Sequence, residues 1–136
     1  MMSGRFAVAA VARAIDQPKG SPNGTEGAVI DTEHLSRMTL GELSLQREVL
    51  ALFDRQADML MPRIRQGGPA MAAASAHTLK GSAVGIGAFK VARAAEAVEQ
   101  AQSLEIRDAS IAAAVDTLAA VLEEAKAEIA RLLQAA

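Results

Sequence analysis

The sequence contains no cysteine and almost no aromatic side chains. Only 2% of its 136 residues are aromatic, and these are Phe6, Phe53 and Phe89. Without cysteine the chain can form no disulfide, no cysteine–zinc site and no thiol nucleophile. The scarcity of aromatics also disfavours β-sheets, in which aromatic and β-branched side chains are enriched. The core of this chain must therefore be aliphatic.

Strong positive charge and long apolar runs are also missing. The formal net charge is −2, so we predict no nucleic-acid partner, because phosphate binding needs a basic face. No stretch approaches the roughly eighteen uninterrupted apolar residues of a membrane span. We therefore expect a soluble, cytoplasmic domain with no membrane association.

Alanine is what the sequence has in abundance. There are roughly thirty copies, and alanine is the best helix former. Hydrophobic residues make up 51% of the chain and charged residues 22%, as in ordinary globular domains. A core of alanine, leucine, valine and isoleucine favours packed helices. The predicted fold class is all-α.

The beginning of the chain differs in composition from the rest. Residues 1–14 superficially resemble a secretory signal, but their apolar run is short and Arg13 interrupts it. Residues 17–27 are rich in glycine and proline, which is typical of a flexible linker. We predict a flexible tail and linker over residues 1–28 and one folded domain over residues 29–136.

Apolar residues in this domain recur with the helical period of 3.6 residues. The pattern predicts an antiparallel four-helix bundle preceded by a short additional helix. Asp31 is a candidate N-cap of the short helix, and Gly87 is a candidate C-terminal stop further along the chain. The predicted helices cover residues 31–40, 42–66, 69–86, 88–104 and 108 to the C-terminus.

The same periodicity predicts which side chains are buried in the second of these helices. Its predicted apolar face consists of Leu45, Val49, Leu52, Phe53, Gln56, Leu60 and Ile64. Pro62 falls inside the pattern and should kink or thin the last turns. Met59, Met61 and Met71 are predicted as core filler rather than as an interaction surface.

Two histidines are the main candidates for chemistry, and the first is predicted to have no functional role. His34 lies near the start of the short helix, beside Glu33 and Arg37. It has no second histidine at i+4 and no carboxylates spaced for a metal. We interpret it as a solvated histidine at a helix end, and we predict no metal site in the chain.

His77 has a different setting, on the helix predicted over residues 69–86. An apolar stripe of this helix is predicted to face the core, namely Ala72, Ala76, Leu79, Ala83 and Ile86. The other face carries His77 among small residues and one cation, namely Ala73, Ala74, Lys80, Gly81, Val84 and Gly85. The pattern therefore points His77 outward.

The two glycines near His77 indicate that a partner contacts this face. Glycine inside a helix costs about 1 kcal/mol relative to alanine, so Gly81 and Gly85 need an explanation. We infer that another molecule approaches the backbone there. Lys80, one turn from the imidazole, can neutralise an anion placed on the ring. The predicted contact residues are Ala73, Ala74, Gly81, Val84 and Gly85.

A family resemblance centres on residues 77–88, which read HTLKGSAVGIGA. This run resembles the motif of histidine-containing phosphotransfer (HPt) domains, His-x-Leu-Lys-Gly followed by small residues and an apolar-Gly-Ala end. Residues 91–99 look like the family's following helix, and Phe53 stands where its preceding helix often has an aromatic. The resemblance extends from about Ile30 to the C-terminus. It implies a four-helix bundle whose exposed histidine relays a phosphoryl group between receiver-domain aspartates.

By this resemblance His77 is the expected phosphoacceptor, and Lys80 is expected to steady the phosphoryl oxygens. The group would come from the receiver aspartate of a hybrid sensor histidine kinase or response regulator, and would pass to another receiver aspartate. No cofactor is expected on this chain, and the Mg²⁺ of the reaction is expected on the partner receiver. The family usually carries the phosphate on Nε2. We expect a monomeric phosphocarrier rather than an independent catalyst.

Two other interpretations stay open. The chain could be the phosphoacceptor domain of a chemotaxis-type kinase, or an adaptor bundle that binds receivers without transfer. In each case docking should centre on His77 and include exposed positions of the second and third predicted helices. Arg55, Arg63 and Arg65 are candidate contacts there.

Overall fold

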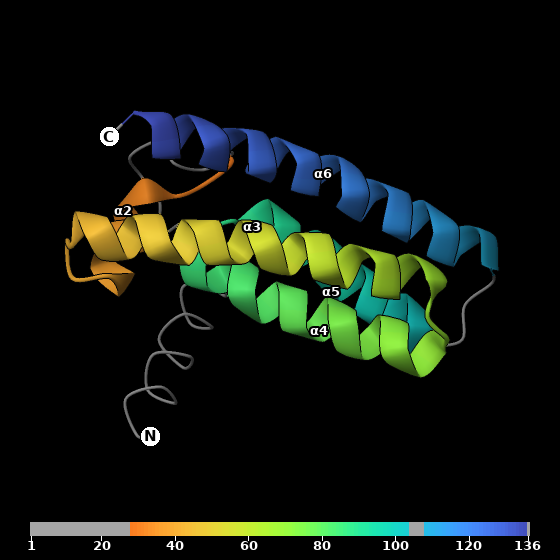
Figure 1. Cartoon of the computed structure of the whole chain (residues 1–136). Helices are drawn as coiled ribbons and strands as arrows, with labels where there is room; N and C mark the ends of the chain where they lie inside the picture. Colours follow the sequence, from red (N-terminus) through yellow and green to blue (C-terminus); the bar gives the residue numbers. More distant parts are fainter. Residues whose placement is uncertain (1–27, 104–107, 136) are drawn as a thin grey trace, which may run out of the picture.

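The computed structural model describes residues 28–103 and 108–135, which form five helices (Figure 1). In chain order these are α2 (Thr32–Met38), α3 (Leu43–Gln66), α4 (Pro69–Ile86), α5 (Phe89–Ser103) and α6 (Asp108–Gln134). This described part of the chain contains no strand. The all-α class and the predicted helices are confirmed, whereas the predicted tail lies almost wholly outside the described residues.

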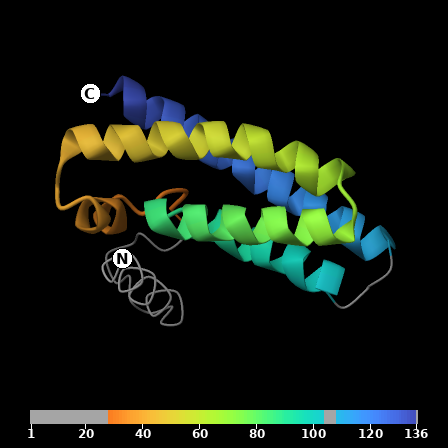
Figure 2. The ribbon, with the colours of Figure 1, turned by 60° about the horizontal axis from the view of Figure 1, so that its bottom comes forward.

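The four long helices pack as an antiparallel bundle, and α2 lies at one end of it (Figure 1, Figure 2). α4 packs against both α3 and α5, while α6 packs against α5 and α3. The short α2 contacts α4 and α3. Because α4 has helical neighbours on two sides, one of its remaining faces is left for solvent or a partner.

The core is built from aliphatic side chains of every helix. The stripe predicted for α4, from Ala72 to Ile86, is buried as expected. Phe53 is the largest fully buried side chain. The buried residues that pack in one cluster include Leu35, Leu50, Phe53, Ile64, Leu79, Val91, Val98, Leu118, Leu122 and Ile129. Each such side chain stabilises the fold by roughly 1.5–3 kcal/mol relative to an exposed one.

Local chemistry explains several helix ends. The Asp31 carboxylate caps α2 by accepting a hydrogen bond from the backbone N–H of His34. Gly87 ends α4 with a φ of 83°, and a Cβ there would lie 2.7 Å from the Asp31 carbonyl oxygen. Gly87 is therefore the structural stop that the sequence predicts. Pro62 does not end α3, which continues to Gln66.

Part of the predicted core face of α3 lies outside the core. Leu45 and Leu52 are exposed, and so are Met59 and Met71, each 52% exposed. Met61 alone among the three methionines packs against the core. The prediction that Met59 and Met71 fill the core is wrong. Met71 lies outside the buried stripe of α4, and Met59 lies outside the row of side chains that α3 buries. That row is Leu50, Phe53, Ala57, Leu60 and Ile64.

His34 is buried, and the prediction of a solvated histidine is wrong. Only 4% of the residue is exposed, because α2 packs against the end of α4. Its Nε2 lies 3.0 Å from the carbonyl oxygen of Val84, so Nε2 carries the proton and donates. The ring also packs edge-on against Phe89, with the centroids 5.1 Å apart. His34 therefore fastens α2 to the C-terminal part of α4.

The burial of His34 predicts a pH dependence of stability. Burial lowers the pKa of His34 below 6.5, although the hydrogen bond to Val84 opposes this effect. Because the unfolded chain binds the proton more readily, stability is complete above about pH 6.5 and falls as the pH drops. Urea unfolding near pH 7.5 and pH 5 should show a larger loss for the wild type than for His34→Gln, whose amide still donates. Equal losses would contradict this role.

Candidate functional site

His77 projects from the outer face of α4, away from the buried stripe. Its side chain is 66% exposed. Ala74 and Gly81 beside it are also exposed, whereas Ala73 is half-buried. The prediction of an outward-pointing histidine is confirmed. A reactant can therefore reach the ring without any rearrangement of the core.

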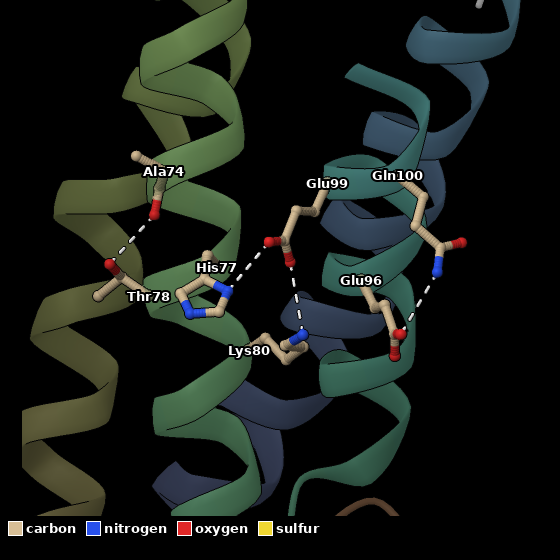
Figure 3. A network of polar contacts seen from close by, with 7 residues as sticks. All are labelled: Ala74, His77, Thr78, Lys80, Glu96, Glu99 and Gln100. Atoms are coloured by element: carbon tan, nitrogen blue, oxygen red, sulfur yellow. Dashed lines mark hydrogen bonds and ion pairs between the residues drawn. The ribbon is translucent and has the colours of Figure 1, made fainter. Parts of the chain in front are cut away.

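A glutamate from the neighbouring helix holds one nitrogen of this ring. Nδ1 of His77 lies 3.0 Å from Oε2 of Glu99 on α5 (Figure 3). An ionised carboxylate can only accept, so Nδ1 donates and carries the proton. In the neutral ring Nε2 then keeps its lone pair. Figure 3 shows this second nitrogen pointing away from Glu99, so its lone pair faces outward and can reach an approaching molecule.

Lys80 approaches the same carboxylate from one turn further along α4. Its Nζ lies 3.4 Å from Oε1 of Glu99 (Figure 3). That oxygen is buried and accepts no hydrogen bond from the described residues. About a quarter of each of the two side chains is exposed, so water screens their attraction only in part. Glu99 thereby holds an ammonium group close to the imidazole.

Gly81 and Gly85 have no steric reason within the described structure to be glycine. A Cβ at either position would meet no described atom within 4 Å beyond the adjacent residues and the backbone of its own helix. Each glycine nevertheless costs about 1 kcal/mol of helix stability relative to alanine. A contact outside this chain would account for that cost, because glycine lets another molecule approach the backbone of α4 beside His77.

Comparison with known proteins identifies the family of the chain. The model of the Hpt domain family matches residues 47–135. The chain belongs to this family. It is also similar to the X-ray structure of a rice protein that is provisionally assigned as a histidine-containing phosphotransfer protein. The TM-score is 0.69 over 94% of each chain, and the 22% sequence identity means that this likeness supports the fold alone. No match was found among the curated proteins.

Membership of the Hpt family establishes the general role of the chain. Hpt domains are phosphotransfer modules of two-component phosphorelays and interact with receiver domains, so this chain is a histidine phosphotransfer protein. None of its described helices is long and apolar enough to cross a membrane. Residues 28–103 and 108–135 hold no group of three or more histidine, cysteine or acidic residues suited to a metal ion.

One predicted contact residue of this Hpt domain is buried. Val84 is only 8% exposed, because α2 covers this end of α4 and His34 donates to the Val84 carbonyl. The prediction that Val84 lies on the partner-facing surface is therefore wrong. Ala74 and Gly81 are exposed, and Ala73 and Gly85 are half-buried, so these four residues are available to a partner.

Sequence reasoning missed Glu99 as a site residue. A signal was present in the sequence: Glu99 follows Val98, which belongs to the buried stripe of α5. This neighbour places Glu99 at the edge of a helix interface. Glu96, one turn earlier, has the same chemistry and a similar helical position. In the structure Glu96 accepts instead from Gln100, and Glu99 reaches His77.

Removal of the Glu99 carboxylate is expected to change which nitrogen of the His77 ring carries the proton. A long-range ¹H–¹⁵N spectrum near pH 8 should show wild-type His77 protonated on Nδ1 and unprotonated on Nε2. Glu99→Ala should shift His77 toward the Nε2–H form, because Nδ1 loses its acceptor. Glu96→Ala is the matched control and should leave the ring unchanged. An unaltered His77 in Glu99→Ala would show that the hydrogen bond does not select the tautomer.

Proposed function

We propose that Nε2 of His77 accepts a phosphoryl group from the phosphoaspartate of one receiver domain and passes it to the aspartate of another. The hydrogen bond from Nδ1 of His77 to Glu99 is the observation that carries this proposal. It leaves Nε2 unprotonated on a side chain that is mostly exposed. A neutral, accessible imidazole nitrogen is the group that nucleophilic attack on phosphorus needs.

The proposed step balances between His77 and the aspartate of the receiver. The lone pair of Nε2 attacks phosphorus, the P–O bond to the aspartate breaks, and its electron pair returns to the aspartate carboxylate. The ring then holds the phosphoryl group on Nε2 and a proton on Nδ1, so it is cationic. The Glu99 carboxylate, 3.0 Å from Nδ1, balances that charge. The return step reverses the same bonds at a second receiver.

We further propose that the Lys80 ammonium group offsets the negative charge of the phosphoryl group. Its ammonium group rests on Glu99 and lies one helical turn from the reacting ring. A rotation of its flexible side chain would bring Nζ to the phosphoryl oxygens, where it would offset their negative charge. We place the Mg²⁺ of the reaction on the receiver. We further propose that a hybrid sensor kinase supplies the first receiver and that the chain acts as a cytoplasmic monomer.

Transfer from a panel of ³²P-labelled receiver domains to the purified chain tests this proposal. We expect acid-labile label on the wild type and a loss of at least about 100-fold in His77→Gln. His34→Gln is the matched control and should accept label, since His34 is buried and its Nε2 is bonded. Label that persists in His77→Gln would contradict the proposal. Receivers that bind the folded wild type but never transfer would instead favour the adaptor interpretation.

A substitution at Gly81 is expected to weaken receiver binding without destabilising the fold. Gly81→Gln should leave the free energy of unfolding unchanged or raise it by up to about 1 kcal/mol, because its side chain enters open space. The dissociation constant for a receiver should rise about tenfold, as the added side chain keeps the partner from the α4 backbone. Ala113→Gln, at an exposed position of α6, is the control. Calorimetric titration that finds equal affinities for both variants would contradict this role.

A further inference from the structure

Helix α2 is too short to be stable without the rest of the fold. A helix of fewer than roughly 12 residues is marginal in water, and α2 has 7. Among the described residues before α3, only Ile30 and Leu35 enter the buried core cluster. Elements with few buried apolar contacts open locally at a lower free-energy cost than the whole domain. The docking of α2 on the bundle therefore depends strongly on its polar contacts.

Two hydrogen bonds fasten this segment to the last turn of α4. The backbone N–H of Asp31 donates to the carbonyl oxygen of Gly87 at 2.9 Å, and Nε2 of His34 donates to that of Val84 at 3.0 Å. A second proton on the ring would sit on Nδ1, for which no described atom serves as an acceptor. The residue is only 4% exposed, so water would solvate that charge poorly. Proton uptake by His34 therefore opposes docking.

Several charges surround His34, but burial has the largest effect on its pKa. Burial lowers the pKa, the hydrogen bond to Val84 and the charge of Asp31 raise it, and Arg37 lowers it. The net result is a pKa below 6.5. The facing turn of α4, residues 81–87, carries no titratable side chain. Charged side chains near the starts of α3 and α5 are solvent-exposed or engaged by α6, namely Glu42, Arg47, Glu48 and Lys90.

The connection from α2 to α3 is strained at a leucine. Leu40 and Gly41 both have a positive φ, of 56° and 75°. Leucine rarely adopts this region, because its Cβ crowds the following carbonyl oxygen. Leu40 is 88% exposed, so burial of its side chain does not offset the strain. A movement of α2 about residues 40–41 would relieve it.

We infer that residues 29–38, which include α2, form an acid-released cover over the C-terminal turn of α4. A proton on His34 detaches this cover, which then moves about residues 40–41 while the four long helices stay folded. Its release would uncover Val84 and Phe89, which His34 contacts in the docked state. The exposed face of the helix that carries His77 would thereby become longer. Such an opening is local and independent of phosphoryl transfer.

Amide hydrogen exchange at pH 7.5 and pH 5, corrected for intrinsic exchange rates, measures this opening. The amides of Leu35 and Thr39, which donate to backbone carbonyls within the cover, report on it. Their protection should fall by at least about fivefold at pH 5, because the open segment binds the proton more readily than the docked one. At both pH values it should be at least about tenfold lower than the protection of the fully buried Leu79 on α4.

Three variants separate the contributions to the opening. His34→Gln still donates to Val84 but takes up no proton, so protection of the cover should change by less than about twofold between the two pH values. His77→Gln is the matched control and should keep the full pH effect, because His77 is exposed and does not contact α2. Leu40→Asn should raise protection about threefold at both pH values, since asparagine adopts a positive φ more readily than leucine.

Each contrary result overturns part of the inference. Equal protection of Leu35 and Leu79 would show that α2 opens only when the whole domain unfolds. A wild type without the pH effect, or a His34→Gln variant that keeps it, would exclude His34 as the trigger. Unchanged protection in Leu40→Asn would exclude the strained hinge. If His34→Gln fails to fold, the wild-type comparison of Leu35 with Leu79 at the two pH values still decides whether acid opens α2 separately.

Discussion

The hydrogen bond from His77 to Glu99 joins two helices, and it forms only because α4 and α5 pack closely. Alanine fills buried positions on both, among them Ala76 and Ala83 on α4 and Ala92 and Ala95 on α5. Such small side chains allow helix axes to approach at the short end of the usual 8–10 Å range. Glu99 can then reach both His77 and Lys80 across the interface. The alanine-rich composition, which first appears as a general helix signal, thus also sets the geometry of the site.

The two sides of α4 have different surroundings. On the side toward α5, the Glu99 carboxylate accepts from Nδ1 of His77 and pairs with the Lys80 ammonium group. The side toward α3 borders a groove whose lining includes Met59, Met71 and Arg63. Gly81 lies exposed on the same outer face as His77, and no described atom requires it to be glycine. The residues proposed for phosphoryl transfer and for partner contact, His77 and Gly81, therefore lie on a single helix.

Periodicity predicts what depends on one helix at a time. It places His77 outside and Ala72, Ala76 and Leu79 inside, because burial of α4 follows its own 3.6-residue pattern. Periodicity fails where packing against a second helix determines whether a side chain is buried. His34 and Val84 are buried by the packing of α2 on α4, which no pattern within either helix encodes. Met59 is exposed because the bundle buries a neighbouring row of α3, and the choice between Glu96 and Glu99 depends on how α4 and α5 align.

The atom that carries the phosphoryl group tests the central claim most directly. The chain can be labelled with ¹⁵N-histidine and phosphorylated by a receiver, and its two histidines are readily distinguished by NMR. The account predicts a phosphorus–nitrogen coupling on Nε2 of His77, with the Nδ1 proton retained and hydrogen-bonded to Glu99. A coupling on Nδ1 of His77, or on either nitrogen of His34, would contradict it.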